Sequence, residues 1–191
     1  MVHIVVRDYR QDDWPAVCRI HDAARRIEVR GFMPPDIVLP MDQTAGPEGF
    51  FESQTWVACV EPGEQTIAGF IAIKGAEITW CYVDPSWHRQ GIGRKLVEHV
   101  KPILGEHGFV LTVAENPAGV AFYQSLGFVV CARFPGEAQG YPCECVRLAL
   151  PTSRHRQRPP TPTALALRLA GFTQELPGRA FLGEDGIYDW A

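Results

Sequence analysis

The residues with the clearest chemical use lie in one stretch near the middle of the chain. A run of β-branched and aromatic residues, Ile78 to Val83, is typical of a strand. Asp84-Pro85 ends the strand, because proline has no N–H to donate to a sheet ladder. His88-Arg89-Gln90-Gly91-Ile92-Gly93 follows and leads into apolar residues at helical spacing, through Leu96, Val97 and Val100. The free N–H groups of a helix's first turn bind anions, and glycine lets a phosphate approach the backbone. The stretch therefore predicts a phosphate site.

The spacing of the glycines indicates which kind of phosphate-bearing ligand the site could bind. A dinucleotide-binding motif needs a third glycine where this chain has Leu96, and a P-loop needs Gly-Lys followed by Ser or Thr, which is absent. The stretch instead resembles motif A of the GNAT superfamily of N-acetyltransferases, Gln/Arg-x-x-Gly-x-Gly/Ala. His88 stands at the first position in place of Gln or Arg. A generic strand–loop–helix turn is the plain alternative.

A second motif follows in the expected order. From Asn116 to Phe128 the chain reads Asn-Pro-Ala-Gly-Val-Ala-Phe-Tyr-Gln-Ser-Leu-Gly-Phe. Pro117 suits the first turn of a helix, Asn116 suits its cap and Gly127 suits its C-terminal end. This stretch resembles motif B of the same superfamily. The two motifs identify the chain as a member, and the resemblance covers residues 1–150.

The resemblance implies an α/β fold of the α+β type, with a mixed central sheet of about six to seven strands and helices on both faces. The sequence pattern predicts a helix that Asp12 or Asp13 caps and that runs to about Arg30, and a turn at Glu61-Pro62-Gly63-Glu64. The predicted strands are 2–7, 55–60, 66–73, 77–83 and 109–114, followed by a hairpin of 128–134 and 143–150.

The resemblance also implies acetyl-CoA as the acetyl donor. Its pantetheine arm would enter a gap between diverging strands 77–83 and 109–114 and pair with the backbone of Tyr82 and Val83. Its pyrophosphate would lie on the N–H groups around the first turn of the helix. Asn116 and Tyr123 complete the predicted donor site. The residues around the pyrophosphate are Arg89, Gln90, Gly91, Ile92, Gly93 and Arg94, of which the two arginines either contact phosphate or remain solvated.

Acetyl transfer needs a neutral amine and a proton for the departing thiolate. Glu77 is the candidate base, since it lies fourteen positions before Gly91, where histone-type members of the superfamily carry their glutamate. An exposed strand carboxylate is the plain alternative, and a water chain is the mechanistic one. Tyr123 is the candidate acid, with packing as its alternative, and the backbone N–H near Val83 would stabilise the oxyanion. A covalent acetyl-enzyme on Cys81 is less favoured than direct transfer, because buried strand cysteines are usually inert.

The acceptor is predicted to be a primary amine on a small molecule or a peptide. Its site would be built from the irregular segment 31–54 and a hairpin loop at 135–142. A packed connector with one short helix is the alternative for the first of these segments. Three aromatic residues either line this site or belong to the core: Trp80, Tyr82 and Trp87. Two other classes remain open, which are a non-catalytic acyl-CoA sensor and an interaction protein that works through its C-terminal tail.

Composition limits the remaining possibilities. Hydrophobic residues make up 46% of the chain and the net charge is −4, which fits a globular protein and does not favour nucleic acid as a partner. No apolar run approaches the roughly 20 residues of a membrane span, so no membrane partner is expected, and a cytoplasmic location is predicted. The six cysteines are predicted to be reduced thiols, with no metal site.

Three segments are expected along the chain. Residues 1–150 are the acetyltransferase domain, 151–163 are a linker rich in proline and arginine, and 164–191 are an extension of unknown role. The extension partly echoes residues 121–148, so a remnant repeat, an arm that docks on a second subunit and chance all stay open. A homodimer is one of these possibilities.

Overall fold

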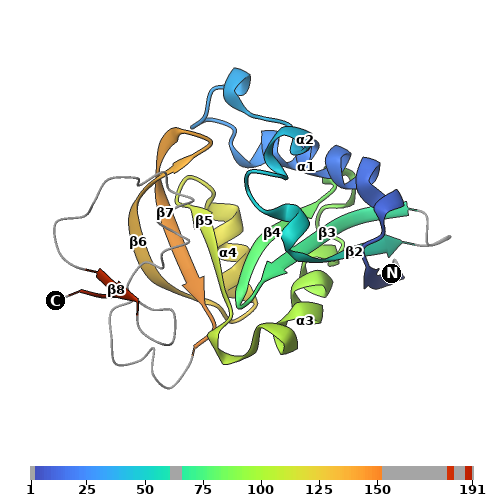
Figure 1. The fold of residues 1–191 in the computed structure, drawn as a ribbon. Helices are drawn as coiled ribbons and strands as arrows, with labels where there is room; N and C mark the ends of the chain where they lie inside the picture. Colours follow the sequence, from blue (N-terminus) through green and yellow to red (C-terminus); the bar gives the residue numbers. More distant parts are fainter. Residues whose placement is uncertain (1–2, 61–65, 152–179, 183–187, 191) are drawn as a thin grey trace. The chain divides into compact units, whose positions relative to one another are not determined.

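The computed structural model describes residues 3–60, 66–151, 180–182 and 188–190. The chain divides into two compact units, residues 1–110 and 111–191. Seven strands form one mixed sheet in the order β1-β2-β3-β4-β5-β7-β6 (Figure 1). They are β1 (Ile4–Asp8), β2 (Gln54–Val60), β3 (Thr66–Lys74), β4 (Glu77–Val83), β5 (Phe109–Val113), β6 (Val129–Ala138) and β7 (Tyr141–Ala149). The α+β class and the mixed sheet with helices are confirmed.

The first unit is an antiparallel meander with a helix on each face. Strands β1 to β4 pair antiparallel in chain order, and β5 joins β4 in parallel. The interior residues of β2 and β3 are buried along both faces, which matches their nearly continuous apolar sequence. Helices α1 (Trp14–Glu28) and α3 (Ile92–Leu104) lie on opposite sides of these strands (Figure 1).

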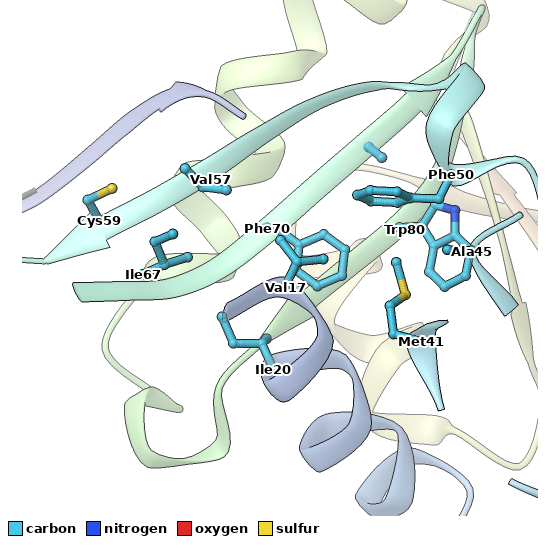
Figure 2. Close-up of a cluster of buried hydrophobic side chains, with 11 residues drawn as sticks. Val17, Ile20, Met41, Ala45, Phe50, Val57, Cys59, Ile67, Phe70 and Trp80 are labelled. Carbon is cyan, nitrogen blue, oxygen red and sulfur yellow. The ribbon is translucent and has the colours of Figure 1, made fainter. Parts of the chain in front are cut away.

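The core on the α1 side is a cluster that joins the helix, the sheet and the connector after the helix. Val17 and Ile20 of α1 face Phe70 of β3 and Trp80 of β4 (Figure 2). The connector adds Phe50, which contacts both Phe70 and Trp80 edge to face at about 6 Å between ring centroids. These contacts fix the connector against the sheet.

For the connector between α1 and β2, the sequence left two alternatives open, an irregular segment beside the acceptor and a packed connector with one short helix. The connector contains a short helix, α2 (Met41–Thr44), and 3₁₀ turns at Pro35–Ile37 and Phe50–Glu52. Met41 and Ala45 are fully buried in the α1-side cluster. The segment is therefore a packed connector rather than a loose loop, because its apolar residues belong to the core.

Helix α3 packs unusually close to the sheet at Gly69. A Cβ built on Gly69 would lie 3.1 Å from Ile92 Cγ2 and 3.2 Å from Leu96 Cδ1. Glycine at this position therefore lets the first turn of α3 rest directly on β3.

The predicted capping of α1 by an aspartate is only partly correct. Asp13 stands at the N-cap of α1, but its carboxylate makes no hydrogen bond to that helix. It accepts hydrogen bonds from both Nη atoms of Arg7, at 2.7 and 2.8 Å, and from the Arg10 N–H at 2.7 Å. The carboxylate ties strand β1 to a 3₁₀ turn (Gln11–Asp13) that precedes the helix, because a charged guanidinium is a stronger partner than a backbone N–H.

The second unit contains α4 (Pro117–Ser125) and the β6–β7 hairpin. The predicted loop at 135–142 is wrong, because the two strands continue through it and pair up to Ala138 and Tyr141. Only Gln139 and Gly140 form the turn, with φ of 52° and 78°, the positive values that a tight two-residue hairpin needs. Pro135 is tolerated because β6 is an edge strand.

Short strands β8 (Ala180–Leu182) and β9 (Tyr188–Trp190) pair antiparallel within the C-terminal extension. The predicted turn at 61–64, the linker from residue 152 and the rest of the extension lie outside the described residues. None of the six cysteines takes part in a disulfide. Within the described ranges, no helix is long and apolar enough to cross a membrane, and no group of acidic, histidine or cysteine side chains is arranged to hold a metal ion.

Candidate functional site

The N-terminus of α3 has the properties of an anion site. Gly91 is its N-cap residue, with φ of 87°, and no side chain caps the helix. The first hydrogen bond of the helix runs from the Lys95 N–H to the Gly91 carbonyl at 3.0 Å, so the N–H groups of residues 92–94 have no acceptor within the helix. A Cβ built on Gly91 would meet nothing within 4 Å, so an anion can approach this backbone.

The loop between β4 and α3 is held by Asp84. Its carboxylate accepts hydrogen bonds from the Ser86 N–H at 2.9 Å and the Ser86 hydroxyl at 2.6 Å, and it forms an ion pair with Arg19 of α1. Burial opposes ionisation of the Asp84 carboxyl, but the bonds from Ser86 and Arg19 outweigh it, and the pKa lies below its usual value. The carboxylate therefore stays charged near neutral pH and keeps the 3₁₀ turn Pro85–Trp87 in place.

His88, the departure from the family motif, contacts the strand that it follows. Its Nε2 lies 3.1 Å from the carbonyl oxygen of Val83, and because that oxygen can only accept, the ring donates its Nε2–H to it. The first motif position is thus used to fold the loop back onto the end of β4.

The other predicted phosphate-binding side chains are exposed. Arg89 has φ of 63°, a left-handed conformation that is uncommon for a residue with a side chain. Gln90 follows it on the surface. Arg94 lies 3.6 Å from Glu98 on the same helix face, a weak surface pair. Both arginines are therefore accessible to a phosphate, and the structure leaves both predicted roles open.

The backbone of β4 is paired differently along its two edges. Toward β3, the pairing reaches Tyr82 and Val83. Toward β5, the parallel register consists of two pairs, Glu77 with Phe109 and Ile78 with Val110. Tyr82 and Val83 thus lie beyond the two residues of β4 that pair with β5 in this register.

A β-bulge decides which way Glu77 faces. Ala72 pairs with Trp80 but Ile73 pairs with Ile78, so β4 carries one extra residue at this point. Glu77 consequently pairs with Lys74, whose Nζ bonds to Glu52 of the connector at 2.5 Å. Since paired residues share a face, Glu77 lies on the connector side of the sheet. It is 2% exposed, so the alternative of an exposed strand carboxylate is wrong.

The three aromatic residues whose roles the sequence left open lie in different environments. Trp80 is buried in the α1-side cluster, and Trp87 is half-buried in the loop before α3. Tyr82 packs at the edge of the cluster, where the ring of His21 contacts it edge to face at 5.0 Å. Burial lowers the pKa of His21, so this ring stays neutral near neutral pH and acts as core.

The hydroxyl of Tyr82 belongs to a polar network that the sequence analysis did not anticipate. It donates to Glu28 Oε2 at 3.1 Å, and Arg25 Nη1 donates to the same oxygen at 2.8 Å. Burial and the nearby Glu28 carboxylate raise the pKa of Tyr82, so its hydroxyl keeps its proton. The i, i+3 spacing of Arg25 and Glu28 is a signal that could have predicted their pairing, but no local pattern could have predicted the contact with β4.

The remaining predicted residues lie on α4 in the second unit. The Asn116 side-chain oxygen accepts from the Gly119 N–H at 2.9 Å, which confirms its predicted role as the helix cap. Tyr123 is 7% exposed and contacts Phe128 at 5.7 Å between ring centroids. The candidate site residues therefore divide between the two units, with the phosphate loop and Glu77 in the first and these two in the second.

A helix that follows a strand, begins at a glycine and leaves its first N–H groups uncapped can bind the phosphate of a donor molecule. Residues 51–130 match the family of acetyltransferase (GNAT) domains. The chain is 33% identical over 101 residues to the peptidyl-lysine N-acetyltransferase YjaB of Salmonella typhimurium. The matched stretch covers 52% of this chain and 67% of that protein. The chain is 40% identical over 78 residues to a ribosomal protein bS18-alanine N-acetyltransferase of the same organism, covering 37% of this chain and 52% of that one. The chain thus spans about two thirds of the first relative and about half of the second.

Solved structures share the fold. A GCN5-related N-acetyltransferase from Rhodopseudomonas palustris superimposes with a TM-score of 0.63 at 16% identity, over 78% of this chain and 95% of that one. YncA from Salmonella typhimurium, solved with acetyl-CoA, gives a TM-score of 0.57 at 17% identity, over 82% of this chain and 97% of that one. The protein belongs to the GNAT family of N-acetyltransferases.

The donor of this family is acetyl-CoA. The chain's own residues fit it, because the uncapped turn at Gly91 offers backbone N–H groups to a pyrophosphate and the space beside Gly91 is open.

Proposed function

We propose that the protein moves an acetyl group from acetyl-CoA to a primary amine by direct attack within a ternary complex. The observation that carries this proposal is the N-terminus of α3, where an uncapped helix begins at Gly91 just after the end of β4. The N–H groups of residues 92–94 would bind the pyrophosphate, with Arg89, Gln90 and Arg94 around it.

The pantetheine arm would lie along β4. Its amides would pair with the backbone of Tyr82 and Val83, which lie beyond the two pairs recorded between β4 and β5. Bound acetyl-CoA supplies the thioester carbonyl that the amine attacks. The backbone N–H near Val83 would then stabilise the developing oxyanion.

Glu77 would accept the proton of the attacking amine, directly or through water. Its place on the connector face of the sheet supports this role, because the acceptor is expected on that side. A lysine-like amine has a pKa of about 10.4, so it is mostly protonated at neutral pH and needs a base.

Tyr123 would protonate the departing thiolate, and Asn116 fixes the start of the helix that carries it. Direct transfer is preferred to a covalent route through Cys81. Cys81 pairs with Ile71, so its side chain lies on the α3 face of the sheet, opposite to Tyr82.

The acceptor is a small-molecule or peptide amine. Relatives named as peptidyl-lysine and ribosomal protein alanine acetyltransferases favour a peptide amine. A non-catalytic acyl-CoA sensor is the competing function, and the names of these relatives count against it.

A panel of acceptors distinguishes the proposed acetyltransferase from the non-catalytic sensor. CoA release would be followed with lysine peptides, peptides with an N-terminal alanine, small amines and aminoglycosides. Release that depends on an amine supports the proposal. Binding of acetyl-CoA without turnover of any amine would instead favour the sensor.

A further inference from the structure

The β-bulge in β4 is bound to the neighbouring strand by a side chain of its own. The pairs on either side of the bulge are Ala72 with Trp80 and Ile73 with Ile78. The extra residue of β4 between these pairs is Thr79. Its hydroxyl donates to the Ala72 carbonyl at 3.2 Å, at the point of β3 where the register shifts. A hydrogen bond of the extra residue therefore stabilises the bulge.

The same hydroxyl lies beside the connector. Thr79 Oγ1 is 3.4 Å from the Oγ of Ser53, the last residue of the connector before β2. The Ser53 hydroxyl donates to the Gly49 carbonyl at 2.9 Å and so closes the 3₁₀ turn Phe50–Glu52. Each hydroxyl has one proton, and the two shorter bonds to carbonyls take both, so the contact between the two hydroxyls is the weakest of the three. Thr79 thus lies where the connector meets the bulge.

The bulge decides the environment of Glu77. Without the extra residue, alternation along β4 would exchange the faces, with the Glu77 carboxylate on the α3 face and Ile78 on the connector face. The α3 face is apolar, since Ile92 and Leu96 are buried against it. A carboxylate among these side chains would lose its hydration, so the exchanged arrangement is disfavoured. Loss of the Thr79 hydroxyl should therefore loosen the bulge rather than reverse the strand.

We propose, resting on the function proposed above, that Thr79 is a positioning residue for Glu77. Its hydrogen bond to the Ala72 carbonyl stabilises the bulge, and the bulge directs the Glu77 carboxylate toward the connector, where the acceptor is expected. Thr79 gives no proton to the reaction and acts only through the direction in which the base faces. Its loss should therefore lower activity only under conditions in which the base is needed.

Four variants test this role. Thr79→Val keeps the branched shape that suits a strand and removes the hydroxyl. Thr79→Ala is a second variant without the hydroxyl, for use if valine disturbs folding. Thr79→Ser keeps the hydroxyl and loses a methyl group. Thr66→Val is the matched control, because Thr66 is an exposed threonine of β3 outside the bulge. The acetyl-CoA-induced rise in Tm, measured for each variant, shows whether the donor site is intact.

The pH dependence of kcat/KM separates positioning of the base from support of the fold. The acceptor is the amine of the panel that turns over fastest, studied from about pH 6 up to its own pKa. At the low end, Thr79→Val should lower kcat/KM by about two- to tenfold, the size expected for one neutral hydrogen bond. Near the pKa of the amine, the variant should approach the wild type, because solvent then supplies the neutral amine. Thr79→Ser and Thr66→Val should follow the wild type at every pH.

A double-mutant cycle shows whether Thr79 acts through Glu77. In the Glu77→Gln background, Thr79→Val should cause no further loss of kcat/KM, since no base remains to be positioned. A residue that only supports packing would lower kcat/KM by the same factor in both backgrounds.

Several results would overturn the inference while the proposed function stands. They are a loss that is equal at all pH values, a loss of the same size in both backgrounds, a serine variant as impaired as the valine variant, and full activity of both variants that lack the hydroxyl. Loss of the acetyl-CoA response in both of those variants would also overturn it, because Thr79 would then support the whole domain. Absence of turnover with every amine refutes the proposed function, and this role of Thr79 falls with it.

Discussion

A Cβ on Gly69 would lie 2.9 Å from the carbonyl oxygen of Tyr82. The same atom would press on Ile92 and Leu96, so one glycine sets how closely α3 approaches the end of β4. The position of the anion site therefore depends on a residue that is itself remote from the phosphate.

Gly69→Ala should lower the free energy of unfolding by about 1–3 kcal/mol, because a backbone carbonyl cannot give way as a flexible side chain can. It should also weaken acetyl-CoA binding, since α3 must shift. Gly46→Ala is the control, because a Cβ there meets nothing within 4 Å. Urea unfolding and calorimetric titration measure both effects. Equal stability of the two variants would show that the sheet adjusts without cost.

Gly91→Val should abolish the rise in Tm that acetyl-CoA produces, because a branched side chain would occupy the space beside the N-terminus of α3. The substitution also costs about 1–2 kcal/mol of backbone strain at φ of 87°. Gly31→Val is the matched control, since Gly31 has φ of 94° and open surroundings. Both variants should lose stability, but only the Gly91 variant should lose the response. An intact response there would exclude this turn as the pyrophosphate site.

The local patterns predicted the elements of the site well. Strand β4 was predicted with its observed bounds, Glu77–Val83, and α4 begins at the predicted Pro117. Proline and glycine restrict the backbone wherever they occur, so their effects can be read without the fold.

Other features depend on contacts that the sequence does not display. Simple alternation of side chains along β4 would place Glu77 on the sheet face opposite to Trp80 and Tyr82. The bulge at Ala72/Ile73 instead places Glu77 on the same face as these two residues, and no glycine in the sequence marks the bulge. Pro135 and Gly136 indicated a loop, yet pairing with Glu144 and Cys143 keeps them in β6. The link between Glu28 and Tyr82 joins residues that are distant in the chain.

Asp13→Asn should reduce stability at neutral pH, because the hydrogen bonds from Arg7 hold the pKa of Asp13 below its usual value. A carboxyl with a depressed pKa stabilises the fold above its unfolded pKa, about 3.9, and this contribution is lost as pH falls through the folded pKa. The difference between wild type and variant should therefore shrink below about pH 4. Thermal unfolding from pH 7 to 3 measures it, with Asp12→Asn as the exposed control. A difference that is constant across pH would exclude an electrostatic origin.

Glu77→Gln should slow acetylation mainly below the pKa of the acceptor, with activity recovering as pH rises. A base is superfluous once solvent has deprotonated the amine. Recovery should come near pH 8 for a peptide N-terminus and about two and a half pH units higher for a lysine, following their pKa values of about 7.7–8.0 and 10.4. Profiles of kcat/KM against pH for both acceptors measure this. A uniform loss at all pH values, or none, would remove Glu77 from the mechanism.

Tyr123→Phe should slow turnover by about 10²–10⁴-fold with little change in acetyl-CoA affinity. A thiol with a pKa near 8.5 leaves as a thiolate that is poorly stabilised away from water, so a proton donated as the C–S bond breaks lowers the barrier. The ring of the variant keeps the contacts with Phe122 and Phe128, so packing should persist.

Tyr9→Phe is the control for Tyr123→Phe, because the Tyr9 hydroxyl makes no hydrogen bond within the described part of the chain and its loss should leave turnover unchanged. A donor with a more acidic thiol needs less protonation, so it should narrow the gap between Tyr123→Phe and wild type. Single-turnover measurements isolate the chemical step from product release. If the variant matches the wild type in that step, Tyr123 serves only to pack α4 against Phe128, and the proton must come from elsewhere.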